Sequence, residues 1–422
     1  MRAHIPGGPV RTVTAGIHGS MAEQRWRAPA SRAADVLSLG SFVILGLPDG
    51  MLGTAWPSMR ATFGAPVGAL GLILLVITAG SVLVTAFVGP LIRRLGVPAL
   101  LAVAGTTAAL GFSGLALAPG LWLVFAVAAL TGAAAGAMDG GLNTAVALTG
   151  RSRLLNLLHG AYGVGTAIGP LIVTAAILTG SWRPAYLVQV ALDLLLALLW
   201  LRHRRRGRAE AGVAPSPAAA AGQPHPSARW SRRRYGGVVL AGMGVFFVYT
   251  GLEVGAGQWE ASFCRGHLNM PAGAAGLAVF GYWGALTAVR IGLALWPVPP
   301  HAVVRWGSVL AVLAAAAIWW QPDAAVAVAG FVVLGGALAG IFPALIALTP
   351  VRLGEHRAHN VISWQVGAAA AGGAGISAVI GLLIGAAGLA VLGPAITVLA
   401  LIVVAAELTL SRLAPAGKLG ID

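Results

Sequence analysis

The sequence predicts an all-α polytopic membrane protein with twelve transmembrane helices, arranged as two six-helix bundles that are parallel repeats. Three observations support this fold class. Of the 422 residues, 58% are hydrophobic and only 9% are charged, whereas soluble domains are about 45–50% apolar. The mean hydropathy is +0.86. Apolar stretches long enough to cross ~30 Å of hydrocarbon recur along the chain, and the second set of stretches repeats the first.

The twelve predicted spans each contain about 20 apolar residues, the number that a helix needs to cross a bilayer. In order they are Val36–Trp56, Pro66–Val88, Val97–Leu117, Leu121–Leu148, Leu154–Leu178, Pro184–Leu201, Gly236–Phe263, Ala272–Trp296, Val303–Trp320, Ala324–Leu348, Val361–Ile384 and Leu389–Leu410.

The polar segments between and around these spans define the domains. Residues 1–34 lack the apolar core of a signal peptide and are expected to form a disordered cytoplasmic tail; the sequence leaves open whether Met1 or Met21 is the start. An N-terminal bundle (35–201) is followed by a Pro-, Ala- and Arg-rich central loop (202–235), which is typical of a flexible linker. A C-terminal bundle (236–411) and a short tail (412–422) complete the chain. The single cysteine, Cys264, excludes an internal disulfide.

The distribution of positive charge predicts the orientation. With both termini inside, 24 of the 27 basic residues lie on the cytoplasmic side, and only Arg60, Arg183 and Arg265 lie outside. Cytoplasmic loops of membrane proteins carry such an excess. The net charge of +15 therefore faces the cytoplasm and anionic lipid headgroups, and nucleic acid is not an expected partner.

An internal repeat relates the two bundles at a constant offset of 204 residues, the separation of Asp49 and Glu253. The same offset aligns Gly53 with Gly257, Arg153 with Arg357, and Asn156 with Asn360. Glycine is so common that its matches carry less weight than those of the carboxylates, arginines and asparagines. Two same-orientation halves with a site between them near the midplane are therefore predicted.

Several segments resemble the major facilitator superfamily, and more narrowly its fucose-permease-related branch of sugar and proton symporters. They are "LPDGMLGTAWPSM", "AGAMDGGLNTAVAL", "LNLLHGAYGVGTAIGP", "YTGLEVGAGQWEASF" and "GYWGALTAVRIG". The resemblance implies that Asp49 and Asp139, in spans 1 and 4, take part in proton coupling and substrate binding, and that Asn143 belongs to the same site. It also implies a protein that usually works as a monomer.

Two departures from that family qualify the resemblance. The loop after span 2, "GPLIRRLG", has Ile92 and Arg93 where the superfamily's signature has aspartate and its neighbour. Arg93 and Arg94, with Arg290 near the cytoplasmic end of span 8, are the gating candidates. Span 5 has His159 and Tyr162 where fucose permease has amide side chains, so fucose itself is not the expected substrate.

The intramembrane carboxyl groups are the strongest functional candidates. A charge at the bilayer centre costs roughly 2.5–3.5 kcal/mol on insertion scales, and such residues usually face a cavity or a proton path. Asp49 lies 13 residues into its predicted span, about 20 Å from the cytoplasmic edge. We interpret Asp49 and Asp139 as the proton-coupling pair and Glu253 as a third member. The alternative is a protonated carboxyl that only hydrogen-bonds a neighbouring helix, which is the interpretation favoured for Asp193.

Polar and aromatic side chains near these acids are the predicted substrate-binding residues. His159, Asn156 and Tyr162 are spaced three apart on one helical face, and a packing role for the histidine is the alternative. Gln258 with Trp259, and Trp364 with Gln365, combine an amide with a ring that can pack on a sugar; interfacial tryptophan and interhelical contacts are their alternatives. No residue cluster predicts a metal site.

These features predict a secondary active transporter of a small polar solute, a sugar or similar metabolite, by proton-coupled symport. Proton-coupled efflux of drugs or metabolites is the alternative, and a receptor built on a transporter fold is a more distant one. No nucleophile elbow or metal-protease motif predicts an enzyme. The only lysine, Lys418, lies outside any P-loop. No cofactor is expected beyond a coupling ion, either proton or sodium. The Ala- and Arg-rich composition favours a bacterial cytoplasmic membrane.

Overall fold

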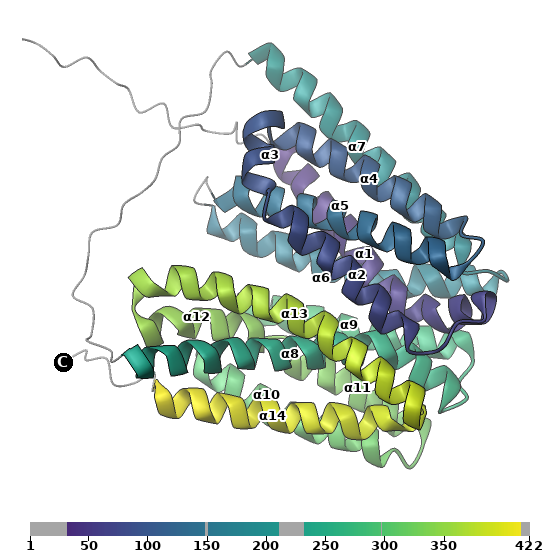
Figure 1. The fold of residues 1–422 in the computed structure, drawn as a ribbon, viewed down its shortest axis with the longest axis vertical. Coiled ribbons are helices and arrows are strands. Elements are labelled where there is room, and N and C mark those ends of the chain that lie inside the picture. The colour runs from purple at the N-terminus through teal and green to yellow at the C-terminus, as the bar shows by residue number, and fades with distance from the viewer. Residues whose placement is uncertain (1–31, 148–150, 211–231, 297, 415–422) are drawn as a thin grey trace, which may run out of the picture.

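The computed structural model describes residues 32–147, 151–210, 232–296 and 298–414, and the described chain is entirely helical (Figure 1). Its first half contains α1 (Arg32–Phe63), α2 (Ala69–Thr85), α3 (Val88–Leu95), α4 (Val97–Ala116), α5 (Leu121–Ala147), α6 (Ser152–Leu178) and α7 (Arg183–Glu210). Its second half contains α8 (Arg232–Gly266), α9 (Ala272–Leu295), α10 (Pro300–Trp320), α11 (Ala324–Leu338), α12 (Ile341–Leu353), α13 (Glu355–Ala387), the 3-10 helix η1 (Leu389–Val391) and α14 (Leu392–Leu413).

The number of membrane spans agrees with the sequence. Eleven segments of the described chain are long and apolar enough to cross a membrane, and α11 with α12 forms one of them. Helices α2 and α3 are bent by 56° at their break and make the twelfth span when taken together. The prediction of an all-α protein with twelve spans is therefore confirmed.

Several predicted boundaries need correction. Helix α7 continues to Glu210 and α8 begins at Arg232, so both edges of the predicted central loop 202–235 are helical. The predicted loop that holds Arg93 and Arg94 is the helix α3. The arginine-rich ends of α7 and α8 lack the hydrophobic signal of a span, and α3 is too short to give one, but arginine is compatible with helix geometry in all three. Helix α1 begins at Arg32 and α14 ends at Leu413, and most of the two predicted tails lies outside the described residues.

The 204-residue offset holds for every span. Adding it to the bounds of α4, 97 and 116, gives 301 and 320, and α10 is Pro300–Trp320. Adding it to the bounds of α6 gives 356 and 382, and α13 is Glu355–Ala387. One difference is that α5 is continuous whereas its counterpart is divided into α11 and α12. The chain therefore consists of two structural repeats.

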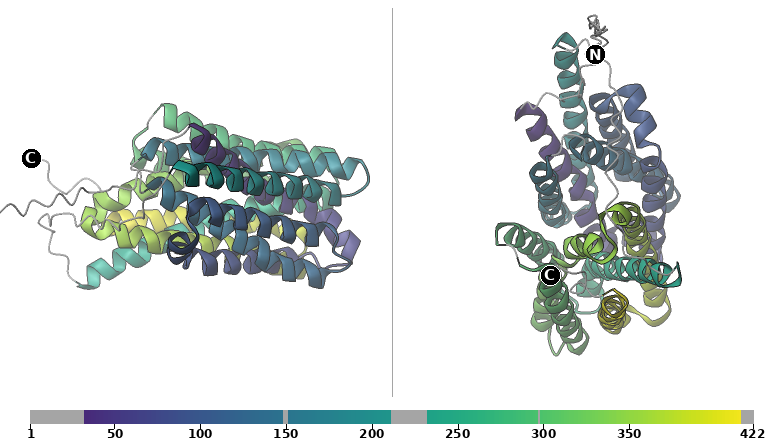
Figure 2. Two further views of the ribbon diagram at one scale, coloured as in Figure 1. Left: turned by 90° about the horizontal axis from the view of Figure 1, so that it is seen from above. Right: turned by 90° about the vertical axis from the view of Figure 1, so that its left-hand side faces the viewer.

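The two repeats form separate bundles that lie side by side (Figures 1 and 2). Helix α1 packs mainly on α6, α2 on α5, and α4 on α7; in the second half α8 packs mainly on α13 and α9 on α11. Between the halves, α6 contacts α9, α2 contacts α13, and α1 contacts α8. The repeat relates α2 to α9 and α6 to α13. The α2–α13 and α6–α9 contacts are therefore equivalent, as a pseudo-twofold axis requires.

Close contacts between the halves lie toward one end of the molecule. Arg234, at the start of α8, donates to the carbonyl oxygen of Leu413 at the end of α14, which places these two ends together. At the opposite end, Arg265 of α8 donates to Ser58 Oγ of α1 at 2.9 Å. There too, a Cβ added to Gly71 of α2 would lie 2.4 Å from the Cα of Ala378 in α13. The halves are thus in direct backbone contact at the end away from Leu413.

Candidate functional site

A cavity of about 460 Å³ lies between the two halves and extends into the first. Its walls come from α1, α2, α4, α5, α6 and α7 of the first half, and from α8, α9 and α13 of the second. Most of the lining is apolar. The ionisable and amide side chains of the lining are Asp49, Asp139, His159, Tyr162, Tyr186, Gln189, Asp193 and Gln258. A cavity at the interface of two repeats is the usual position of a transporter's site.

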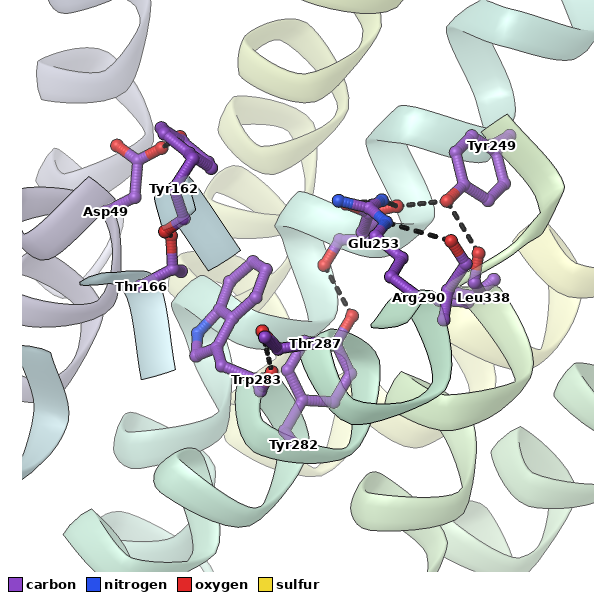
Figure 3. Close-up of polar contacts among 11 residues, drawn as sticks. Asp49, Tyr162, Thr166, Tyr249, Glu253, Tyr282, Trp283, Thr287, Arg290 and Leu338 are labelled. Carbon is purple, nitrogen blue, oxygen red and sulfur yellow. Dashed lines mark hydrogen bonds and ion pairs between the residues drawn. The ribbon is translucent and has the colours of Figure 1, made fainter. Parts of the chain in front are cut away.

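Asp49 faces this cavity because of the local sequence of α1. A Cβ added to Gly50 would lie 2.0 Å from the carbonyl oxygen of Thr166, so only glycine allows α1 to approach α6 this closely. The approach brings the hydroxyl of Tyr162 to Asp49, to which it donates a hydrogen bond (Figure 3). Asp49 itself is an exposed residue that lines the cavity. The "LPDGM" segment thus presents a carboxylate to space that a solute or proton can occupy.

Asp139 lies across the first half on α5 and also lines the cavity. Asn143, one turn later, donates from Nδ2 to Asp139 Oδ1 at 2.9 Å. Asn143 is not among the lining residues. Its contact with Asp139 therefore orients a cavity carboxylate, and the structure does not place it directly against a solute.

Glu253 occupies a different environment from its repeat counterpart Asp49. Arg290 Nη2 lies 3.3 Å from each carboxylate oxygen of Glu253, and the Tyr249 hydroxyl donates to the same carboxylate (Figure 3). Arg290 Nε donates to the carbonyl oxygen of Ala339 at 2.8 Å. That carbonyl lies four residues before Pro343, whose missing N–H leaves it without a helical partner. Arg290, predicted as a gating residue, thus joins α8, α9 and the α11–α12 break within one half, and neither it nor Glu253 lines the cavity.

Two glutamines hold α1 from opposite sides. Gln258 of α8 donates from Nε2 to the main-chain carbonyl of Asp49 at 2.8 Å. Gln189 of α7 donates from Nε2 to the carbonyl of Ile44 and to Asp193 Oδ2, at 3.2 Å each. Ile44 lies four residues before Pro48, so its carbonyl is again one that a proline has released. Of the two, only Gln258 was a predicted site residue.

The remaining predicted residues divide into two groups. His159 and Tyr162 line the cavity, with the His159 ring 5.8 Å from the ring of Phe42, whereas the Asn156 side chain lies outside the described residues. Trp259, Trp364 and Gln365 are not among the lining residues, so the structure does not bring the predicted ring-and-amide pairs together at the cavity.

Each of these three side chains has another environment. Trp259 is fully buried, and its Nε1 donates to the Ser377 carbonyl at 3.0 Å. Trp364 is 50% exposed, and Gln365 accepts a hydrogen bond from Thr349. Arg93 and Arg94 are exposed on α3, and nothing in the described chain assigns them a partner across the halves.

Sequence reasoning missed two acidic residues. Asp193, interpreted as structural, lines the cavity although it is only 2% exposed. Glu260, one heptad after Glu253, is fully buried, and neither of its carboxylate oxygens has a hydrogen-bond partner among the described residues. It does not line the cavity. The sequence did contain a sign of Glu260. It lies seven residues after Glu253 in an apolar helix, and this spacing places both acids on one helical face.

Comparison with known families decides the assignment. The family model described as Major Facilitator Superfamily matches residues 38–378. The chain belongs to the major facilitator superfamily. No curated protein sequence matches it significantly. Members of this superfamily are transporters, so the chain is a multi-pass membrane transporter and not an enzyme.

Solved structures share the fold at low sequence identity. A D-xylose-proton symporter matches with a TM-score of 0.72 at 13% identity, covering 92% of this chain and 98% of its own. A peptide transporter POT in complex with sulfate matches with a TM-score of 0.69 at 14% identity, covering 90% and 95%. A nucleoside transporter, the NupG D323A mutant, matches with a TM-score of 0.65 at 15% identity, covering 90% and 99%. At these identities the likeness concerns the fold, and the solutes of these proteins differ from one another.

Proposed function

We propose that this major facilitator is a secondary active transporter that carries a small polar solute, a sugar or similar metabolite, together with protons by alternating access. One observation carries the proposal. Asp49 of α1 and Asp139 of α5 line the same cavity between two structurally repeated halves. The D-xylose-proton symporter among the structural neighbours has a chemistry of this kind, but at 13% identity it supports the fold and not the solute.

The chemistry of the two carboxylates supports proton coupling. Each receives one hydrogen bond from a neutral donor, Asp49 from Tyr162 and Asp139 from Asn143. No Lys or Arg is among the described lining residues, so neither carboxylate has a fixed positive partner in the cavity wall. A carboxylate in a low-dielectric site without a counter-ion is costly, and binding a proton removes that cost. A group of this kind can be loaded on one side of a membrane and emptied on the other.

The orientation follows from the charge distribution. With the arginine-rich ends of the helices facing the cytoplasm, the backbone contacts between the halves lie on the outer side. The conformation is then the one closed to the outside. We expect the protein to act as a monomer in the cytoplasmic membrane of a bacterium.

Transport by purified protein in proteoliposomes tests the proposal. An inward proton gradient is expected to drive accumulation of a labelled solute, and Asp49→Asn and Asp139→Asn are each expected to lower accumulation at least tenfold while solute exchange at equal concentrations continues. Asp35→Asn, which removes a carboxylate bound to Arg151 at a helix end, is the matched control. Accumulation that is unchanged in both cavity variants contradicts the coupling assignment.

Proton-coupled efflux is a second candidate because most of the cavity lining is apolar, as suits amphipathic compounds. A resistance profile of cells lacking the transporter distinguishes efflux from uptake. Sodium is the competing coupling ion, since a carboxylate serves either ion. Accumulation that survives a proton uncoupler and stops when sodium is replaced identifies sodium.

A further inference from the structure

Helix α7 presents three chemically distinct side chains to the cavity in one row. Tyr186, Gln189 and Asp193 are spaced i, i+3 and i+7, which places them on one helical face, and all three line the cavity. They are 1%, 2% and 2% exposed, respectively. We call these three residues the α7 stripe. The sixth span of the chain thus contributes a polar surface to a cavity whose walls are otherwise mostly apolar.

The stripe has hydrogen-bond acceptors but lacks donors for them. Gln189 uses its amide nitrogen on the carbonyl of Ile44 and on Asp193 Oδ2. A carbonyl can only accept, so this contact orients the amide and fixes Oε1 as the atom that remains. Gln189 Oε1 is buried without a hydrogen-bond partner among the described residues. Asp193 receives only the neutral donor of Gln189. A buried acceptor without a partner costs about 1–3 kcal/mol, so the stripe is complementary to a group that brings several N–H donors.

Charge points to the same ligand. Asp193 is one of three cavity carboxyl groups, with Asp49 and Asp139, and the described lining contains no Lys or Arg. Arg290 of α9 does not line the cavity and is paired with Glu253. A buried carboxyl group needs either a proton or a positive partner, and because the described cavity wall offers Asp193 no Lys or Arg, a cationic ligand is the partner that can supply the charge. Two lining residues of the second half, Thr250 of α8 and Trp283 of α9, have a donor without a hydrogen-bond partner among the described residues. Neither belongs to the stripe.

An aromatic surface completes the site. The ring of Tyr186 stacks on that of Phe112, with centroids 6.0 Å apart and an interplanar angle of 20°, and both residues line the cavity. Aromatic faces attract ammonium groups, by about 0.5–2 kcal/mol. A carboxylate, an amide oxygen and an aromatic ring on one face together provide charge, directed acceptors and apolar contact for an alkylammonium ion.

We propose that the α7 stripe binds a protonated amine, so that the solute of the transporter is an organic amine with an apolar body. This inference rests on the proposed transport function and puts an amine in place of the sugar as its substrate class. The ammonium group donates to Asp193 and to Gln189 Oε1, while the carbon skeleton packs against Phe112 and Tyr186. Because a proton on Asp193 and the ammonium group compete for the same carboxylate, binding of the amine releases a proton when Asp193 is protonated. The protons that travel with the amine are therefore assigned to Asp49 and Asp139, which lie outside the stripe. The other titratable side chains of the lining are Asp49, Asp139, His159 and Tyr162.

Ligand binding to the purified full chain tests the proposal with matched probes. Phenethylamine is expected to raise the melting temperature, and phenethyl alcohol, which has the same skeleton without the charge, is not. Asp193→Asn is expected to weaken amine binding at least tenfold. A purely structural role, in which protonated Asp193 pairs with the Gln189 amide, predicts no such loss because asparagine keeps a neutral hydrogen-bonding group there. Glu260→Gln, which neutralises a buried carboxyl outside the cavity, is the matched control and is expected to retain binding.

The outcomes separate this proposal from the transport function. Equal binding of amine and alcohol, or full amine affinity in Asp193→Asn, overturns the amine site. If a neutral sugar is then accumulated in a manner that depends on Asp49 and Asp139, the proposed function stands and only the substrate class falls. If no solute of either kind is accumulated, the proposed function falls first. Should Asp193→Asn not fold, two other measurements decide the question. A preference of the unaltered chain for amine over alcohol, together with weaker amine binding by Tyr186→Leu, supports the site; absence of either result overturns it.

Discussion

At the scale of single residues, four intramembrane acids have three different environments. Asp49 and Asp139 face the cavity with one neutral donor each. Glu253 is paired with Arg290, and Glu260 is buried without a partner in the described chain. The partner decides the charge state that a buried carboxyl can sustain, because an unpaired charge in low dielectric is far more costly than a paired one. Of these four acids, only Asp49 and Asp139 line the cavity, as Asp193 also does.

The Glu253–Arg290 pair gives a test at this scale. Arg290→Met leaves a carboxylate next to the α11–α12 break without its counter-ion, and leaves the Ala339 carbonyl without its donor. We expect a loss of stability of up to about 3 kcal/mol, since removing one partner of a buried pair is more costly than replacing both. The double variant Glu253→Met/Arg290→Met is expected to recover part of that loss. Melting temperatures measure both; a double variant less stable than Arg290→Met contradicts the argument.

At the scale of helices, proline and glycine set the shape of the spans that form the site. Pro48 and Pro343 each release a carbonyl one turn earlier, at Ile44 and Ala339, and in both halves a polar side chain from another helix binds it. Gln189 and Arg290 are thereby held at defined positions. These two hydrogen bonds to released carbonyls connect α1 to α7 and the α11–α12 break to α9.

Replacement of Pro48 tests whether the missing helical hydrogen bond in α1 serves transport. Pro48→Ala restores an N–H that can bond the Ile44 carbonyl, and alanine is favoured over proline in a helix interior by about 3 kcal/mol. We expect a higher melting temperature together with slower transport, because the new N–H competes with Gln189 for the Ile44 carbonyl and a helix with all its hydrogen bonds bends less easily. Thermal unfolding and initial transport rates check the two effects. A variant that is stabilised and transports at the unaltered rate would show that the missing hydrogen bond has no role in transport.

The sequence predicts some levels of this organisation well and others poorly. Span number, repeat offset and the acids of α1 and α5 follow from hydropathy and from the cost of burying charge, which act on the sequence directly. The i−4 rule for proline predicts which carbonyl is released, but the side chain that binds it depends on tertiary packing. The rotation of each helix is set by packing as well, which is why the sequence could not show that Trp259 and Trp364 lie off the cavity wall and that Asp193 lies on it.

At the scale of the whole molecule, the internal repeat determines how the two halves are arranged and also underlies the alternating access that we propose. The α6–α9 and α2–α13 contacts are equivalent under the pseudo-twofold axis, so the halves can rock about the shared α1–α8 contact. The contacts away from Leu413 hold them in one state. Among the described residues they are backbone approaches at glycine, such as Gly71 against Ala378, together with the hydrogen bonds of Arg265 to Ser58 and of Gln258 to the Asp49 carbonyl. Contacts without ion pairs can form and separate in each cycle at little electrostatic cost.

The approach at Gly71 predicts how this state can be displaced. A Cβ there would lie 2.4 Å from the Cα of Ala378, which is backbone and cannot move aside, so Gly71→Leu is expected to force the halves apart at this end and slow transport several-fold. Gly385→Leu, on α13 where an added Cβ meets nothing within 4 Å, is the matched control.

The only cysteine, Cys264, is buried, so Ser58→Cys in a Cys264→Ser background reports the opening through its labelling by a membrane-impermeant maleimide. Faster labelling in Gly71→Leu than in the control is expected because Ser58 lies in the contact that the leucine separates. Equal labelling in the two variants would mean that this contact does not close the outer side, and that the alternating-access interpretation has assigned its gate to the wrong end.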